Sequence, residues 1–205
     1  MNSGTIQIMV NVGGVVMQKT ITRTADHANI YGDGRADIPI AAGTPVATWT
    51  KSDIDTGTAT LTEGHGLSSG TFDVFWDGGV KYGATGLLTV NSLALDGGTG
   101  DDYPTTGEAG MVVCKAQVIN TEIDGDAVAM IAISASRRAL LRFYDINSAL
   151  VGDPIELAAD EPWVWWADGV FSNPLTGNPI RSAKLSSGSI TAGVFSIQSL
   201  EDSTP

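Results

Sequence analysis

The sequence has few of the side chains that catalysis and metal binding need. It holds one cysteine and two histidines among 205 residues. Zinc needs several convergent nitrogen or sulfur ligands, and a cysteine nucleophile needs a neighbouring base. The lone Cys114 has no disulfide partner, and its apolar neighbours predict a buried structural thiol. We therefore expect a protein that is not an enzyme, with no catalytic residue, cofactor or metal.

Positive charge is scarce as well. The chain has 11 Lys and Arg against 23 Asp and Glu, a net charge of −12. The pair Arg137-Arg138 stands alone, and no basic stripe exists that could attract a phosphate backbone, so nucleic acid is not an expected partner. The acidity has two interpretations: solubility, or docking onto a basic partner surface.

Long hydrophobic runs are also missing. The longest apolar runs are far too short to cross a bilayer, and the N-terminus lacks the basic-then-apolar order of a signal peptide. We expect no membrane partner and synthesis in a cytoplasm.

Short apolar runs between glycine-rich turns are what the sequence does have. Apolar and polar residues alternate over residues 6–12, Gly13-Gly14 follows, and residues 15–23 run back, which predicts a hairpin. Residues 38–40 contain Pro39, which cannot donate to a sheet, so they predict an edge strand.

The middle of the chain carries shorter strands at closer spacing. Such spacing is typical of a small barrel, and a glycine- and aspartate-rich loop over residues 96–102 follows it. The predicted strands are 58–61, 72–76, 80–82, 87–90 and 93–95.

The last block returns to longer strands. The turn 124–126 predicts a hairpin of residues 117–123 and 127–133, and the second of these is apolar on both faces, as a covered central strand would be. Residues 140–146 and 190–200 add strands, and residues 156–160 form one helical turn at most.

The simplest architecture for these segments is all-β. Residues 1–50 and 104–205 form a β-sandwich, and residues 51–103 form a small β-barrel inserted into it. A plain string of two or three modules is the alternative.

The middle block resembles a recurrent module of phage tail and virion proteins. The resemblance is carried by the GHGLSSG segment at 64–70, the apolar strand at 72–76, and Thr89-Val90 followed by Leu93 and Leu95. The glycines would make the bend and Leu67 would plug the barrel. The chain as a whole is similar to small β-rich proteins of phage and prophage structural gene clusters, and the resemblance implies no catalytic residues.

Two polar features have a simple structural interpretation. His65 lies between two glycines, where we expect it to hydrogen-bond its own loop. The acidic turns 96–102 and 124–126 are expected to be solvated; they offer oxygens to calcium but lack the order of an EF-hand loop.

The segment 163–166 is the most unusual local feature. In a strand, Trp163 and Trp165 point to one face and Trp166 to the other. These three are the interface candidates, because aromatic side chains are favoured at the buried centres of interfaces. Core packing and glycan stacking are the alternatives.

Together with the absence of catalytic motifs, this resemblance implies a structural virion protein of a tailed phage. We expect an external capsid decoration protein that forms a homo-oligomer with phage capsid or tail proteins as partners. A tail or neck protein is one alternative, and a carbohydrate- or receptor-binding sandwich is the other. Its location would be the virion, after synthesis in the host cytoplasm.

Overall fold

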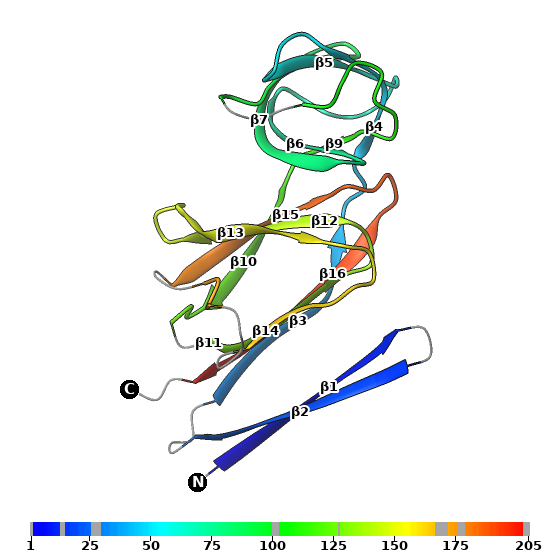
Figure 1. Ribbon diagram of the computed structural model, residues 1–205. Coiled ribbons are helices and arrows are strands. Elements are labelled where there is room, and N and C mark those ends of the chain that lie inside the picture. Colours follow the sequence, from blue (N-terminus) through cyan, green and yellow to red (C-terminus); the bar gives the residue numbers. More distant parts are fainter. Residues whose placement is uncertain are drawn as a thin grey trace.

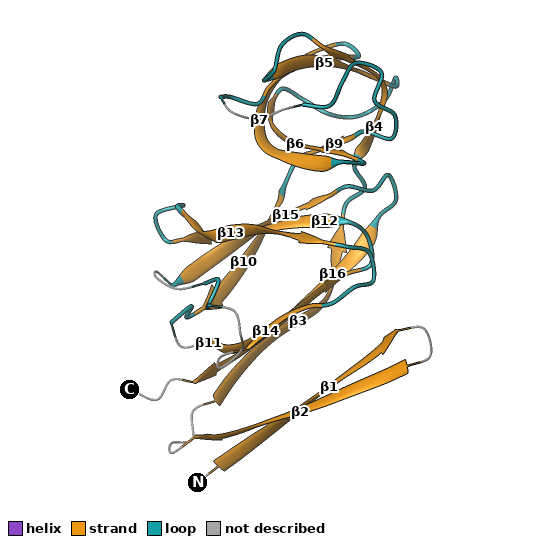
Figure 2. Cartoon of the chain, in the orientation of Figure 1, coloured by secondary structure: helices purple, strands orange, loops and turns teal. Residues whose placement is uncertain are grey.

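The computed structural model describes residues 2–12, 15–25, 30–99, 103–126, 128–166, 172–175 and 179–202. Every regular element among them is a β-strand, so the predicted all-β fold with a small barrel is confirmed. Figure 2 shows strands joined by loops and turns throughout this part of the chain.

Two four-stranded sheets form a sandwich (Figure 1). One has the order β10 (Gln117–Ile123), β15 (Ile180–Ser187), β12 (Ala139–Asp145) and β13 (Leu150–Leu157). The other has the order β14 (Trp163–Trp166), β11 (Val128–Ala135), β16 (Gly193–Asp202) and β3 (Ile30–Ile40). Both sheets contribute aliphatic and aromatic side chains to one core, including Ile131, Leu141, Phe143 and Phe195.

Six strands close into a barrel that stands on the sheet containing β12 (Figure 1). They are β4 (Thr44–Lys51), β5 (Thr56–Leu61), β8 (Ser92–Asp96), β7 (Gly79–Thr89), β6 (Gly70–Trp76) and β9 (Val112–Cys114). The short β9 closes the ring because it pairs with β4 on one side and β6 on the other.

Large rings fill the barrel because glycines on its wall leave room for them. A Cβ at Gly57 would lie 2.3 Å from the Trp49 ring, and one at Gly86 would lie 2.4 Å from the Phe72 ring. The Trp49 indole also stacks at a tilt on Tyr103, 5.1 Å between centroids, and donates to the Pro104 carbonyl at 3.0 Å. Glycine at these two wall positions is therefore required by the large rings inside the barrel.

The GHGLSSG bend behaves as predicted. Gly64 and Gly66 have positive φ, and Leu67 packs against the barrel core. The Leu67 amide donates to His65 Nδ1 at 3.0 Å, so Nε2 carries the proton and donates to the Val90 carbonyl at 2.9 Å. The histidine thus fastens its own loop to the turn between β7 and β8.

The strands divide the chain differently from the boundaries expected at residues 50 and 103. Thr44–Lys51 belongs to the barrel, because it pairs with β5 and β9, and β9 extends the barrel to Cys114. Among the described residues before 51, only β3 joins a sandwich sheet, and it lies at the edge as Pro39 predicted. The other two strands, β1 (Asn2–Val12) and β2 (Val15–Ala25), form the predicted hairpin as a separate two-stranded sheet; its turn at 13–14 lies outside the described residues.

The predicted hairpin at 124–126 is wrong. β10 lies in one sheet and β11 in the other, so this turn crosses between the sheets. Its crossing is held from outside: Asn173 Nδ2 donates to the Gly125 carbonyl at 2.7 Å, and a Cβ at Gly125 would lie 1.9 Å from the Leu175 carbonyl oxygen.

Two further expectations for the last block have clear outcomes. β11 is central in its sheet, as predicted, with Ile131 and Ile133 buried while Ala132 on the opposite face is half-buried. The helical turn allowed at 156–160 is replaced by the end of β13 and a turn.

Replacing Trp49 with Ala should lower the free energy of unfolding by about 3–5 kcal/mol, as expected for a buried large aromatic residue. Its side chain is 1% exposed, whereas Trp76 is half-buried at the rim of the same core. Trp76→Ala is the matched control and should cost clearly less in chemical denaturation. Equal losses for the two variants would contradict this arrangement of the core.

Candidate functional site: the junction between barrel and sandwich

Strands β6 and β12 are each buried on both faces over part of their length, and they meet at the junction. β12 turns Leu141 and Phe143 into the sandwich core, and it turns Leu140 and Arg142 towards the barrel. On the barrel side, β6 places Phe72 and Val74 in the barrel core and turns the alternate residues outwards. Period-2 geometry therefore gives each strand one face for its own core and one face for the other module.

A small apolar cluster fills the contact between these faces. It consists of Phe75, Val112, Cys114 and Leu140, with Val80 at its margin. Three of its buried members come from the barrel and one comes from the sandwich. Burial of these side chains attaches the barrel to the sheet by the hydrophobic effect.

An ion pair lies beside the apolar cluster. Asp73 of β6 accepts a hydrogen bond from Arg142 Nη2, and the two side chains are 2% and 4% exposed. The second carboxylate oxygen of Asp73 accepts from the Gly83 amide at 2.9 Å, so both oxygens are satisfied. The guanidinium also lies over the Tyr82 ring, 5.0 Å from its centroid. Two charges removed from water in this way must stay paired, which fixes the orientation of the barrel.

Cys114 is the buried structural thiol that the sequence predicts. It is free, and its Sγ donates to the Asp73 carbonyl at 3.7 Å. Burial raises the pKa of the thiol from 9.0 to about 12, with a smaller contribution in the same direction from the Asp73 charge. The thiol is therefore neutral and unreactive near pH 7.

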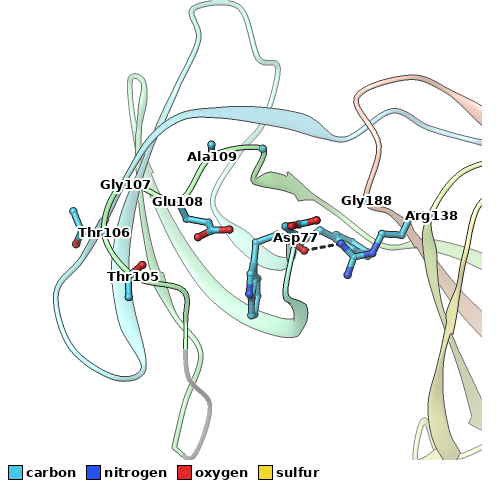
Figure 3. A pocket seen from close by; sticks show the side chains of 11 residues that line it. Asp77, Thr105, Thr106, Gly107, Glu108, Ala109, Arg138 and Gly188 are labelled. Atoms are coloured by element: carbon cyan, nitrogen blue, oxygen red, sulfur yellow. Dashed lines mark hydrogen bonds between the residues drawn. The ribbon is translucent and has the colours of Figure 1, made fainter.

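A second arginine clamps the junction from its edge. Arg138 Nη1 donates to the Trp76 carbonyl at 2.6 Å, Nη2 donates to the Gly79 carbonyl at 3.2 Å, and Nε donates to Glu156 at 2.7 Å. Figure 3 shows this side chain reaching from the sandwich to the barrel turn that carries Asp77. The Arg138 guanidinium is therefore already paired with Glu156 and with two backbone carbonyls of the protein.

An open groove of about 620 Å³ follows the junction. It is lined by the turn after β6, the loop 105–110, Arg138 and Gly188 (Figure 3). Because Arg138 is already engaged by Glu156, the carboxylates of Asp77 and Glu108 give this groove an acidic character. Such a groove can accept cationic or hydrogen-bond-donating side chains of a partner.

The predicted interface residues lie away from this groove. Trp165 is buried in the sandwich core and Trp163 packs against that core from a half-buried position. Both therefore lie on the core side of β14, as strand alternation predicts, while the side chain of Trp166 is outside the described part of the chain.

Sequence reasoning missed Asp73, Arg142 and Arg138 as junction residues. A signal for the first two was present, since each interrupts an otherwise apolar run, FDVF and LLRF. A charge in such a run is seldom buried without a partner. The partner itself lies 69 residues away and has no local signal.

Comparison with protein-family models, with curated proteins and with solved structures found no match for this chain. Within the described residues, no helix is long and apolar enough to cross a membrane, and no three or more His, Cys, Asp or Glu side chains gather where they could hold a metal ion.

Asp73→Ala should destabilise the junction by about 3–5 kcal/mol, because it leaves Arg142 buried without its counter-charge. We expect Cys114 to react much faster with a thiol reagent in this variant under native conditions. The exposed Asp77→Ala is the matched control and should keep the wild-type labelling rate. Unchanged labelling of Asp73→Ala would show that the ion pair does not hold the barrel in place.

The free energy of unfolding should fall above pH 9 because the buried Cys114 thiol resists deprotonation in the folded state. The folded-state pKa of this thiol lies above its unfolded value, so its protonated form contributes fully below pH 9 and is lost between pH 9 and about pH 12. At pH 10 the loss should be about 1.4 kcal/mol relative to neutral pH. The difference in free energy of unfolding between wild type and Cys114→Ala, measured at pH 7.5 and 10, isolates this contribution. A difference that does not change with pH would contradict it.

Proposed function

We propose that this chain is a non-enzymatic structural protein of a tailed-phage particle, placed on the outside of the capsid and in contact with neighbouring subunits. The observation that carries the proposal is the hairpin β1–β2. Its two strands of 11 residues pair with each other over their whole length, from Asn2 with Ala25 to Val12 with Val15. In the described structure they join neither sandwich sheet nor the barrel.

A hairpin of two strands is marginally stable in water when nothing covers it. The register pairs Ile6 with Ile21, Val10 with Met17 and Val12 with Val15. Directly paired residues of antiparallel strands share one side of a sheet, and in the sequence most residues of these pairs are apolar, with Lys19 opposite Ile8 as a charged exception. A neighbouring subunit that covers this side, or adds a strand to its edge, would supply the missing stabilisation.

The sandwich and the barrel support the same role. Each four-stranded sheet ends in two edge strands, which are natural sites for strand addition by a neighbour. The acidic groove at the junction and the net charge of −12 favour a partner with a basic surface. None of these features requires a reactive centre.

The proposal is tested on native particles. Phage or prophage particles from cells that carry the gene are purified, the chain is identified by mass spectrometry, and its density is located by electron microscopy. We expect it on the capsid exterior with a total buried interface above about 1,000 Å². Density on the tail or neck would favour the tail-protein alternative, and absence of the chain from the particles would contradict a structural virion role.

Val10→Asp should abolish assembly, because it places a charge on the apolar side of the hairpin. Asn11→Asp adds the same charge at the next position, which strand alternation places on the opposite side, and it should assemble normally. Light scattering after size-exclusion chromatography and particle binding are the measurements. If Val10→Asp assembled as well as Asn11→Asp, the hairpin would not be the contact.

A further inference from the structure

A second groove, of about 530 Å³, lies at the side of the sandwich where β13 and β14 are the edge strands. Its walls are β13, an edge strand, and the loop 172–174, and Trp163 of β14 lines it as well. The groove therefore runs between the edge of one sheet and the edge of the other.

Backbone packing builds this groove. The register of β12 and β13 shifts between Leu141 and Phe143, and Gly152 on the shifted stretch has φ +67°. A Cβ at Gly152 would lie 2.0 Å from the Pro174 carbonyl oxygen, so the loop rests directly against β13. Asn173 fixes the loop, since its Nδ2 donates to the Gly125 carbonyl and its Oδ1 accepts from the Leu175 amide at 2.9 Å. These contacts fix the loop 172–174 against β13, so this wall of the groove is preorganised for a ligand.

The side chains of the groove combine one aromatic ring with carboxylates. Trp163 is half-buried and held by the sandwich core, so its indole has a fixed place in the wall. Asp153 and Ser172 are exposed in the groove. Glu156 binds Arg138 through Oε1, and its Oε2 makes no hydrogen bond within the described residues. A rigid ring with few well-placed polar groups is the usual composition of a small-ligand site.

This composition selects the chemistry of the ligand. No lysine or arginine is among the described residues that line the groove. Glu156 is paired with Arg138, and the exposed carboxylate of Asp153 repels phosphates, sulfates and acidic sugars. Carboxylates are strong acceptors for hydroxyl donors. A flat indole offers apolar area to the C–H face of a pyranose ring at little entropic cost.

We propose that this groove binds neutral sugar residues of a glycan. Trp163 stacks against a pyranose ring, and Asp153 and Glu156 accept hydrogen bonds from its hydroxyl groups. Such a site goes beyond the structural role proposed above, because it needs no neighbouring subunit and would attach the protein to a glycan-coated surface.

The test uses the full-length protein with cellotetraose, maltotetraose and chitotetraose as neutral probes, and titration calorimetry with tryptophan fluorescence as readouts. We expect at least one probe to bind at millimolar or lower concentration and to change the fluorescence. Trp163→Ala should weaken that binding by about tenfold or more, the loss of one stacked ring. Asp153→Asn, on an exposed side chain, should weaken it without disturbing the fold.

Leu87→Ala is the control, since this exposed residue lies on the barrel and outside the groove. It should bind the probes as the wild type does. If Trp163→Ala fails to fold, Asp153→Asn and Trp163→Phe decide the outcome. Binding of none of the three probes, binding that survives both Trp163→Phe and Asp153→Asn unchanged, or binding of choline in place of the sugars would overturn the proposal.

Discussion

Asp73 and Arg142, both removed from water, hold the barrel in one orientation on the sandwich. Apolar contacts alone would allow the small faces of Phe75 and Leu140 to slide against each other, since burial of apolar area has no direction. A buried charge pair tolerates no such sliding, because each charge would lose its counter-charge. The position of the junction groove and the shielding of Cys114 both depend on that constraint.

Much of the fold could be predicted because its signals are local. Alternation over residues 6–12 marks β1, and the GHGL bend of the barrel carries its own hydrogen bonds through His65. Pairing between distant strands has no such signal. Nothing in the sequence of residues 44–51 indicates that they close a barrel with residues 112–113.

The same limit explains the errors at the candidate sites. The turn at 124–126 has the residues of a hairpin, yet its two strands lie in different sheets, and the turn is contacted by the distant residues Asn173 and Leu175. The three tryptophans of 163–166 stand out in the sequence, but whether Trp163 borders a groove depends on β13 and on the loop 172–174. The sequence shows which residue types are unusual, but their neighbours in space are determined by tertiary packing.

The pairing of β3 with β16 sets the order in which the molecule is completed. Ile40 lies opposite Gly193, and Ile30 lies opposite Asp202. β3 therefore cannot pair until nearly the last residues of the described chain have been synthesised. The barrel strands are contiguous between residues 44 and 114 and can close while the rest is still being synthesised. On the ribosome, the barrel would therefore fold while β3 is still unpaired and the sandwich is incomplete. Its outward-facing residues Asp73 and Phe75 would stay exposed to solvent until β12 is synthesised.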